Sequence, residues 1–414
     1  MTSLIMIEPH RSRLVRAADW LAVAVAVSLP LSTSATGILV AAWAIVLIPV
    51  VDWRELRGIV ATPAGGLPIF LVALGIAGMF WAGVSWPERW DGLTSFLKLL
   101  AIPLLFIQFR QSERGHTVFL GFLLSCVFLL VAGTLALVPG FSFIPLKWDY
   151  VLVKNAATQS GEFATCIGGL LYLAIDFAER RRWGWLAACA AVALGMLANM
   201  LFIATGRTAL VVVLVLLALF AVKRLRPRGR LVFALLALAI GALAWFSSPY
   251  LRERSTQIWT EYDKYEATDE RNSSGERVEF WKKSIEFVQR SPLIGHGTGS
   301  IHALFSEASA GKTGAAGVAS SNPHNQTFAV AIQLGIVGAA ILWAMWICHF
   351  LLFRGTGLTV WIGLVIVTQN IVGSLFNSHL FDFGQGWIYV FGAGVAGGMM
   401  LKRRPVEKPI NARN

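Results

Sequence analysis

The chain has 414 residues, of which 56% are hydrophobic and only 14% are charged, and its mean hydropathy is +0.65. Soluble domains carry about 25% charged residues, so this composition excludes an ordinary soluble protein and indicates an integral membrane protein. A formal net charge of +12 would suggest a nucleic-acid partner in a soluble protein, but here the basic residues gather in loops on one side of the membrane, and we expect no nucleic acid.

Twelve apolar runs along the chain are each long enough to cross a bilayer, which takes about 20 helical residues. We therefore predict an all-α polytopic membrane protein with about twelve transmembrane helices. The first run, with its Arg-rich start, also resembles a signal peptide, but a second run follows at once and the remaining topology does not depend on this choice. The predicted spans are 14–31, 34–51, 67–84, 93–109, 117–138, 161–177, 183–204, 207–222, 231–248, 325–353, 357–376 and 385–401.

The connecting loops alternate in basicity. Loops on one side hold 21 Lys and Arg, whereas the short loops opposite hold four, namely Arg89, Lys147, Lys154 and Arg207. Under the positive-inside rule the basic side is cytoplasmic. We therefore expect both termini in the cytoplasm of a bacterium, with the chain in its inner membrane. The predicted organisation is spans one to nine in 1–248, a periplasmic loop in 249–325, spans ten to twelve in 326–401 and a cytoplasmic tail in 402–414.

The loop 249–325 is the one long polar segment, and it carries two predicted amphipathic helices. Ser273 and Glu276 have the spacing of a capping box, which predicts a helix over 273–289, and a second helix is predicted around 251–265. Residues 295–321 are rich in Gly, Ala and Ser, and we expect a mobile lid or a loop that admits an acceptor. The apolar face expected for the first of these helices is Val278, Trp281, Ile285 and Val288.

His324 is the strongest candidate for a catalytic side chain. Asn322 is a good N-cap and Pro323 suits the first helical position, so His324 is expected in the first turn of the tenth span. A helix N-terminus disfavours imidazolium and attracts anions, which suits a neutral base beside a phosphate. The alternative is a histidine that merely sits in the capping turn at a wet interface.

Two arginines are candidates for binding an anion. Arg207 opens the eighth span on the side that is poor in basic residues, where snorkelling to a lipid phosphate is the alternative explanation. Arg277 lies in the first turn of the 273–289 helix, where it could equally be a solvated charge. Lys98 could pair with a lipid phosphate or face a cavity. Asn325 and the segment 377–379 are weaker candidates.

The sequence offers no pattern that is typical of a metal or cofactor site. His296 and His302 are six residues apart and lack partnering cysteines or acids, and the four cysteines lie far apart in apolar runs. Asp382-Phe383-Gly384 spells a kinase metal triplet without any other kinase motif. We therefore expect neither a metal nor a cofactor.

Three segments together resemble the O-antigen ligase/polymerase superfamily of polytopic glycosyltransferases. Their order and spacing agree with the superfamily, as does the long outer loop between the ninth and tenth spans. Size and loop placement favour the lipopolysaccharide O-antigen ligase. The segments are Thr205-Gly206-Arg207-Thr208-Ala209-Leu210, then Glu276-Arg277 through Trp281 to Ser291-Pro292-Leu293-Ile294-Gly295-His296-Gly297, and then Asn322-Pro323-His324-Asn325 with Leu334-Gly335-Ile336-Val337-Gly338.

The resemblance implies transfer of a glycan from undecaprenyl diphosphate to a sugar of lipid A-core, without a metal and with inversion at the anomeric carbon. Such a displacement needs a base for the acceptor hydroxyl and cations for the leaving diphosphate. Guanidinium fits phosphate oxygens well. We therefore predict that His324 is the general base, that Arg207 and Arg277 hold the diphosphate, and that Asn325 also contacts substrate.

Two rival functions stay open at this stage. The O-antigen polymerase uses the same chemistry with another lipid-linked repeat as acceptor, and the sequence does not separate it from the ligase. A transporter or flippase is suggested by twelve spans alone. Transporters place their polar sites near the midplane on broken helices, whereas His324, Arg207 and Arg277 are all predicted at the outer interface.

Overall fold

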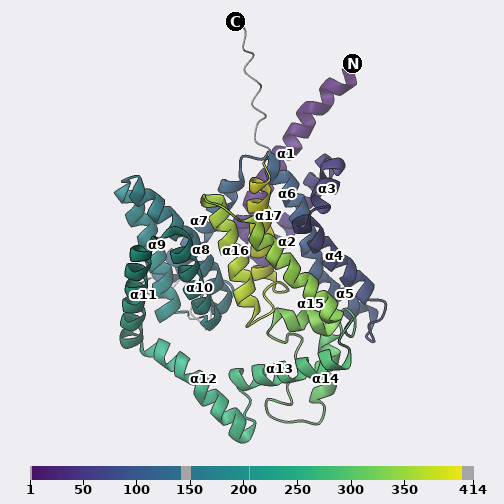
Figure 1. The fold of residues 1–414 in the computed structure, drawn as a ribbon, viewed down its shortest axis with the longest axis vertical. Coiled ribbons are helices and arrows are strands. Elements are labelled where there is room, and N and C mark those ends of the chain that lie inside the picture. Colours follow the sequence, from purple (N-terminus) through teal and green to yellow (C-terminus); the bar gives the residue numbers. More distant parts are fainter. Residues whose placement is uncertain (1, 141–150, 205, 403–414) are drawn as a thin grey trace.

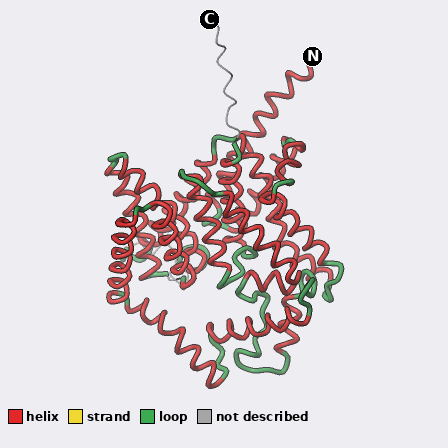
Figure 2. The backbone as a smooth tube through the Cα atoms, viewed as in Figure 1, coloured by secondary structure: helices red, strands yellow, loops and turns green. Residues whose placement is uncertain are grey.

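A computed structural model describes residues 2–140, 151–204 and 206–402, and within these ranges every regular element is a helix (Figure 2). Lys147, Thr205 and the basic tail after Lys402 lie outside the described residues. The predicted all-α class is confirmed.

The N-terminal helices are α1 (Thr2–Ser28), α2 (Thr33–Leu47), α3 (Trp53–Val60), α4 (Pro63–Gly78), α5 (Trp86–Leu97), α6 (Ala101–Gln111), α7 (Gly115–Leu135), α8 (Ala156–Glu179), α9 (Trp183–Phe202), α10 (Arg207–Arg224) and α11 (Pro227–Ser247), with 3-10 turns η1 (Ile48–Val50) and η2 (Lys98–Leu100).

Each of the twelve predicted spans coincides with one or more helices, but the number twelve is not confirmed. In the described part of the chain, seven helices are long and apolar enough to cross a membrane, or eight if α3 and α4, which meet at an 88° bend, count as one span. Helix α10 carries three cations and α17 contains many glycines, and both features lower the mean hydropathy. Length and composition alone therefore do not identify these two helices as membrane spans. The remaining spans stay a prediction.

The centre of the bundle is α17 (Phe383–Met400), which packs against α6 and α16 (Leu358–Ser374) and also touches α7, α8 and α15 (Gln326–Leu352) (Figure 1). Its glycines allow this close packing. A Cβ atom on Gly394 would stand 2.6 Å from the Cδ1 atom of Leu105 on α6, which is too close for two carbon atoms. The position of α17 matters because the loop that precedes it reaches His324.

The polar segment forms α12 (Pro249–Thr268), α13 (Ser273–Arg290) and α14 (Ile301–Ser309), which lie at the end of the bundle opposite the start of α1 (Figure 1). Both predicted helices are present. The predicted N-cap of α13, Ser273, is wrong by one residue. The N-cap is Asn272, whose side chain accepts the N–H of Gly275.

The predicted apolar face of α13 is confirmed only in part, since Val288 packs against the buried cluster that contains Phe280 and Phe287. Ile285 is 47% exposed, whereas Phe280 and Phe287 are buried. Both phenylalanines pack edge-on against Phe305 of α14, with ring centroids 5.6 and 5.2 Å apart. The aromatic side chains therefore decide which face of α13 is buried, since they bring the larger apolar area.

Residues 292–297 are packed into a break in α15, so this part of the expected mobile lid is a docked segment. Gly335 has φ +64°, which interrupts the helix, and the N–H of Ile336 donates instead to the carbonyl of Pro292 at 2.8 Å. His296 and Gly297 donate in turn to carbonyls of α15 at 2.8 Å. A side chain on Gly335 would collide with the carbonyl group of Leu293, so glycine is required there.

Candidate active site

His324 lies in a tight turn just before α15, and the prediction that it falls inside the first helical turn is wrong. Asn325 is the N-cap, since its side chain accepts the N–H of Phe328 at 3.2 Å. The side chain of Asn322 is used otherwise, because its Oδ1 accepts the N–H of His324 at 2.8 Å and the hydroxyl of Ser378 at 2.7 Å. This turn gives His324 a φ of +51°, a conformation that non-glycine residues rarely adopt and that is enriched at functional sites.

A chain of hydrogen bonds fixes which nitrogen of His324 carries the proton. Burial raises the pKa of Asp382 to about 6, and the nearby charge of Lys98 opposes this increase. Since this pKa lies below 7, the carboxyl group is mainly ionised at pH 7 and can only accept hydrogen bonds. Asn377 donates its Nδ2–H to this carboxylate at 2.8 Å, so its Oδ1 faces His324 Nδ1 at 2.9 Å. Nδ1 must then be the donor, and Nε2 keeps its lone pair.

The surroundings of His324 keep the ring neutral. Its pKa is lowered below the usual range, first because the ring is largely buried and second because Arg277 places a positive charge nearby. The ring of Phe280 stacks on it, with centroids 5.8 Å apart and an interplanar angle of 11°. A neutral imidazole with an unprotonated Nε2 is the form that a general base needs.

The two predicted arginines come together beside His324, although they lie on different helices. Arg207 begins α10, and its Nη2 donates to Ser273 Oγ on α13 at 3.4 Å. Arg277 lies on the same part of α13, and its pKa is lowered by burial and then by the charge of Arg207. Neither guanidinium takes part in an ion pair with any described residue. Two close cations without a carboxylate partner favour a bound anion.

His324, Arg277 and Ser273, which is the hydrogen-bond partner of Arg207, line a pocket of about 290 Å³, here called the arginine pocket. Its size is at the lower end of ligand pockets. Within the described residues, no group of three or more His, Cys, Asp and Glu side chains is arranged to hold a metal ion. The arginine pocket is lined by Arg271, Asn272, Ser273, Glu276, Arg277, Phe280 and His324, and Arg271 forms an ion pair with Glu276 at 2.7 Å.

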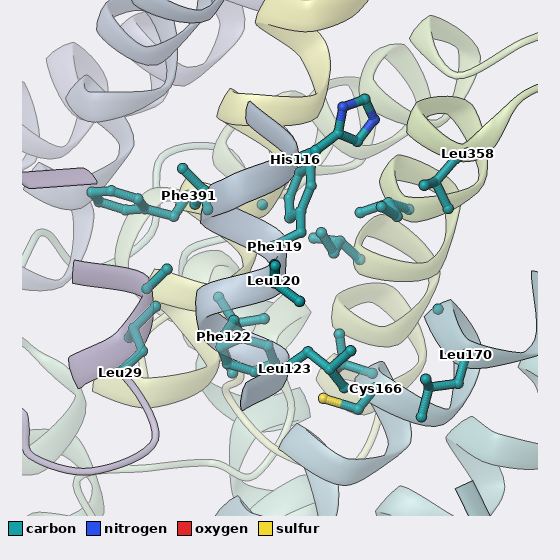
Figure 3. A pocket seen from close by; sticks show the side chains of 18 of the residues that line it. Leu29, His116, Phe119, Leu120, Phe122, Leu123, Cys166, Leu170, Leu358 and Phe391 are labelled. Carbon is teal, nitrogen blue, oxygen red and sulfur yellow. The ribbon is translucent and has the colours of Figure 1, made fainter. Parts of the chain in front are cut away.

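An apolar cavity of about 310 Å³ lies between α1, α7, α8, α16 and α17 (Figure 3). Its wall is made almost entirely of hydrocarbon side chains, among them Phe119, Leu123, Leu170 and Phe391. This is about twice the volume of a cavity that holds benzene, so it can take a segment of one hydrocarbon chain.

The weaker candidates have structural partners. The side chain of Asn325 caps α15 and donates to the carbonyl of Leu375 at 3.1 Å, so a contact with substrate stays a prediction. Lys98 donates to the carbonyls of Phe381 and Asp382 at 2.9 and 3.1 Å, which pins the loop between α16 and α17, and its pairing with a lipid phosphate stays a prediction. His379 is 8% exposed, and burial lowers its pKa to about 4.

Sequence analysis missed Asp382 and the part that Asn377 plays. Asp382 was set aside with the kinase-like triplet, and no spacing rule links it to a histidine 58 positions earlier in the chain. The signal that was available is positional, since Asn377 and Asp382 lie in a predicted outer loop with few other polar groups.

Comparison with known families finds a match for one part of the chain. Residues 192–344 match the family model for O-antigen ligase. This match supports assignment to the O-antigen ligase/polymerase superfamily. The matched segment contains Arg207, Arg277 and His324, whereas Asn377 and Asp382 lie beyond it. It supports a function of the O-antigen ligase or polymerase type in a multi-pass bacterial membrane protein. A comparison with curated proteins finds no match.

Proposed function

We propose that this protein transfers O-antigen glycan from undecaprenyl diphosphate to a sugar of lipid A-core at the periplasmic face of the bacterial inner membrane. The observation that carries the proposal is the meeting of three groups from separate segments. His324 presents an unprotonated Nε2, and Arg207 and Arg277 present two cations without carboxylate partners. A base beside two cations is what displacement of a diphosphate requires.

The proposed step is a single displacement at the anomeric carbon of the donor sugar. The Nε2 atom of His324 takes the proton of the acceptor hydroxyl, and the oxygen forms a bond to the anomeric carbon. The bond from that carbon to the diphosphate oxygen breaks, and the polyprenyl diphosphate leaves with the electron pair. One proton moves to His324 and one glycosidic bond replaces another, with inversion at the carbon.

Arg207 and Arg277 act on the leaving group. Negative charge grows on the bridging oxygen as the bond breaks, and guanidinium groups fixed before the reaction stabilise it without reorganising. Their mutual repulsion, which lowers the pKa of Arg277, is relieved when a diphosphate binds between them. Asn325, beside His324, is proposed to contact the glycan only through the atoms that its capping role leaves accessible.

The apolar cavity of Figure 3 is proposed to hold a segment of the undecaprenyl chain. It offers a continuous hydrocarbon wall between five helices of the bundle. A volume of about 310 Å³ suits one linear chain and not the several acyl chains of lipid A. The donor would then be fixed at both its apolar chain and its diphosphate.

Reconstitution of the purified protein with undecaprenyl-diphosphate glycan and lipid A-core tests the proposal. Wild-type protein should form the glycosylated lipid A-core, with and without EDTA, and His324→Ala should lose about 10²- to 10⁴-fold in kcat. Near-normal transfer by His324→Ala would rule out the base, and activity that needs added Mg²⁺ after EDTA would rule out the metal-free step. In a deletion strain, lipopolysaccharide without any attached O-chain indicates a ligase, whereas a single attached repeat indicates a polymerase.

A further inference from the structure

We propose that a second pocket beside His324 binds sugar residues of the acceptor oligosaccharide, an inference that rests on the transfer proposed above. This pocket has a volume of about 660 Å³ and lies where the turn between α1 and α2, the start of α8 and the start of α17 meet. We call it the saccharide pocket. The residues used in the argument are Ser32, Asn155, Thr158, Asn377, Asp382 and Phe383.

The lining of the saccharide pocket has the chemistry that recognises sugars. Hydroxyl, amide and carboxylate groups can donate to and accept from sugar hydroxyls, which are themselves both donors and acceptors. Phe383 lies among them and is 37% exposed, so its ring is available to a ligand. An aromatic ring covers the apolar face of a sugar while the polar groups bind its edge. The apolar cavity, in contrast, has almost no polar lining.

The charges in the saccharide pocket favour a neutral ligand over a phosphate. The one cation in its lining, Lys154, forms an ion pair with Glu162 at 2.8 Å, and both side chains are largely withdrawn from solvent. Lys154 also donates to the carbonyl of Leu29. Asp382 adds a further negative charge at pH 7. No surplus positive charge remains for an anion. In the arginine pocket, by contrast, Arg277 forms no ion pair with a described residue and has the charge of Arg207 nearby, so the diphosphate and the sugars have different places.

The position of the saccharide pocket assigns it to the acceptor. Asn377 lines this pocket and also accepts the hydrogen bond of His324, which lines the arginine pocket. The two pockets therefore share the hydrogen-bonded pair His324 and Asn377. The cations Arg207 and Arg277 assign the arginine pocket to the diphosphate of the donor. The adjoining polar pocket is then left for the acceptor, whose attacking hydroxyl reaches Nε2 of His324 while its further sugars occupy the saccharide pocket.

Kinetics of four full-length variants test this assignment. Phe383→Ala should raise the KM for lipid A-core about tenfold, as the loss of one central aromatic contact does, and should leave the KM for the donor unchanged. Thr158→Val, which removes one hydroxyl at constant shape, should raise the acceptor KM less. Phe383→Trp should keep acceptor affinity because it keeps a ring. Trp259→Ala, which removes a 72% exposed ring on α12, is the matched control and should change neither KM. A rise in the donor KM for Phe383→Ala would overturn the assignment.

Direct binding separates failure of this inference from failure of the proposed function. The probe is delipidated core oligosaccharide, added to the purified protein in lipid nanodiscs and followed by saturation-transfer NMR. Wild-type protein and His324→Ala should both bind it, since the sugar contacts do not need the base, and Phe383→Ala should lose the signal. Equal binding by Phe383→Ala and wild type would overturn the saccharide pocket even if transfer occurs. Binding that depends on Phe383 would support the pocket even if no transfer is found.

Discussion

Replacing Asn377 with alanine tests whether the tautomer of His324 is set by its neighbour. The substitution removes the acceptor that stands 2.9 Å from Nδ1, so the proton is no longer held there and Nε2 is no longer kept unprotonated. A hydrogen bond of this kind contributes about 1 to 1.5 kcal/mol net, which corresponds to roughly a five- to twelvefold loss of the productive form. We expect kcat to fall by that factor while the KM for the donor stays unchanged, because Asn377 does not line the arginine pocket.

The assay is steady-state transfer in nanodiscs with both substrates in excess over their KM values. Ser378→Ala is the matched control, since it removes a neighbouring hydroxyl that bonds Asn322 at 2.7 Å but leaves the bond between His324 and Asn377 intact. It should retain most of the wild-type kcat. If Asn377→Ala reacts as fast as Ser378→Ala, the hydrogen bond does not control the base, and the chain from Asp382 to His324 has no catalytic role.

Three further predictions concern the base, the cations and the apolar cavity. Because burial and the charge of Arg277 lower the pKa of His324, the acid limb of the pH profile of kcat/KM should have its midpoint below the usual imidazole value of about 6.5. Arg277→Gln removes that charge, so the midpoint for its residual activity should move upward. An unshifted acid limb in this variant would contradict the charge effect. Arg207→Lys keeps the charge but loses the planar fork, so the donor KM should rise roughly tenfold, and an unchanged donor KM would count against a bound diphosphate. Gly169→Leu fills the apolar cavity without a clash at its Cβ atom, so it should raise the KM for the undecaprenyl donor but not for a short-chain analogue. Gly37→Leu on α2, where a Cβ atom also meets no neighbour, is the control. Equal effects of the two variants would place the undecaprenyl chain elsewhere.

The class of fold and the three main site residues were accessible from the sequence because each has a local or statistical signal. Apolar length predicts helices, and a cation on the side that is poor in cations draws attention to Arg207. Arg277 and His324 follow from capping patterns near a polar boundary. None of these signals contains the distance between the three residues, which are 70 and 47 positions apart in the chain. Their proximity comes from the way α13 crosses the end of the bundle.

The errors share one physical origin, which is competition between a local preference and a tertiary contact. Asn322 has the propensity of an N-cap, but its side chain closes a turn with His324 and bonds Ser378, so Asn325 takes the cap. Ile285 fits an apolar stripe, but Phe280 and Phe287 bury more area against α14. The glycine-rich segment 295–321 predicts mobility, yet the break in α15 at Gly335 allows its first residues, 295–297, to dock there.

The position and the tautomer of the His324 ring therefore depend on residues outside its own segment. His324 is held by Asn377, Asn377 is oriented by Asp382, and the carbonyls next to Asp382 are held by Lys98, which comes from η2 near the other end of the sequence. The buried ammonium of Lys98 donates to two backbone carbonyls of one particular loop. Its sequence context left a lipid phosphate and a cavity open as partners, and the structure adds that Lys98 fixes the loop that carries Asn377 and Asp382. The four residues form one unit, so we expect substitutions along it to be non-additive, with a double change at Lys98 and Asn377 costing less than the two single changes together.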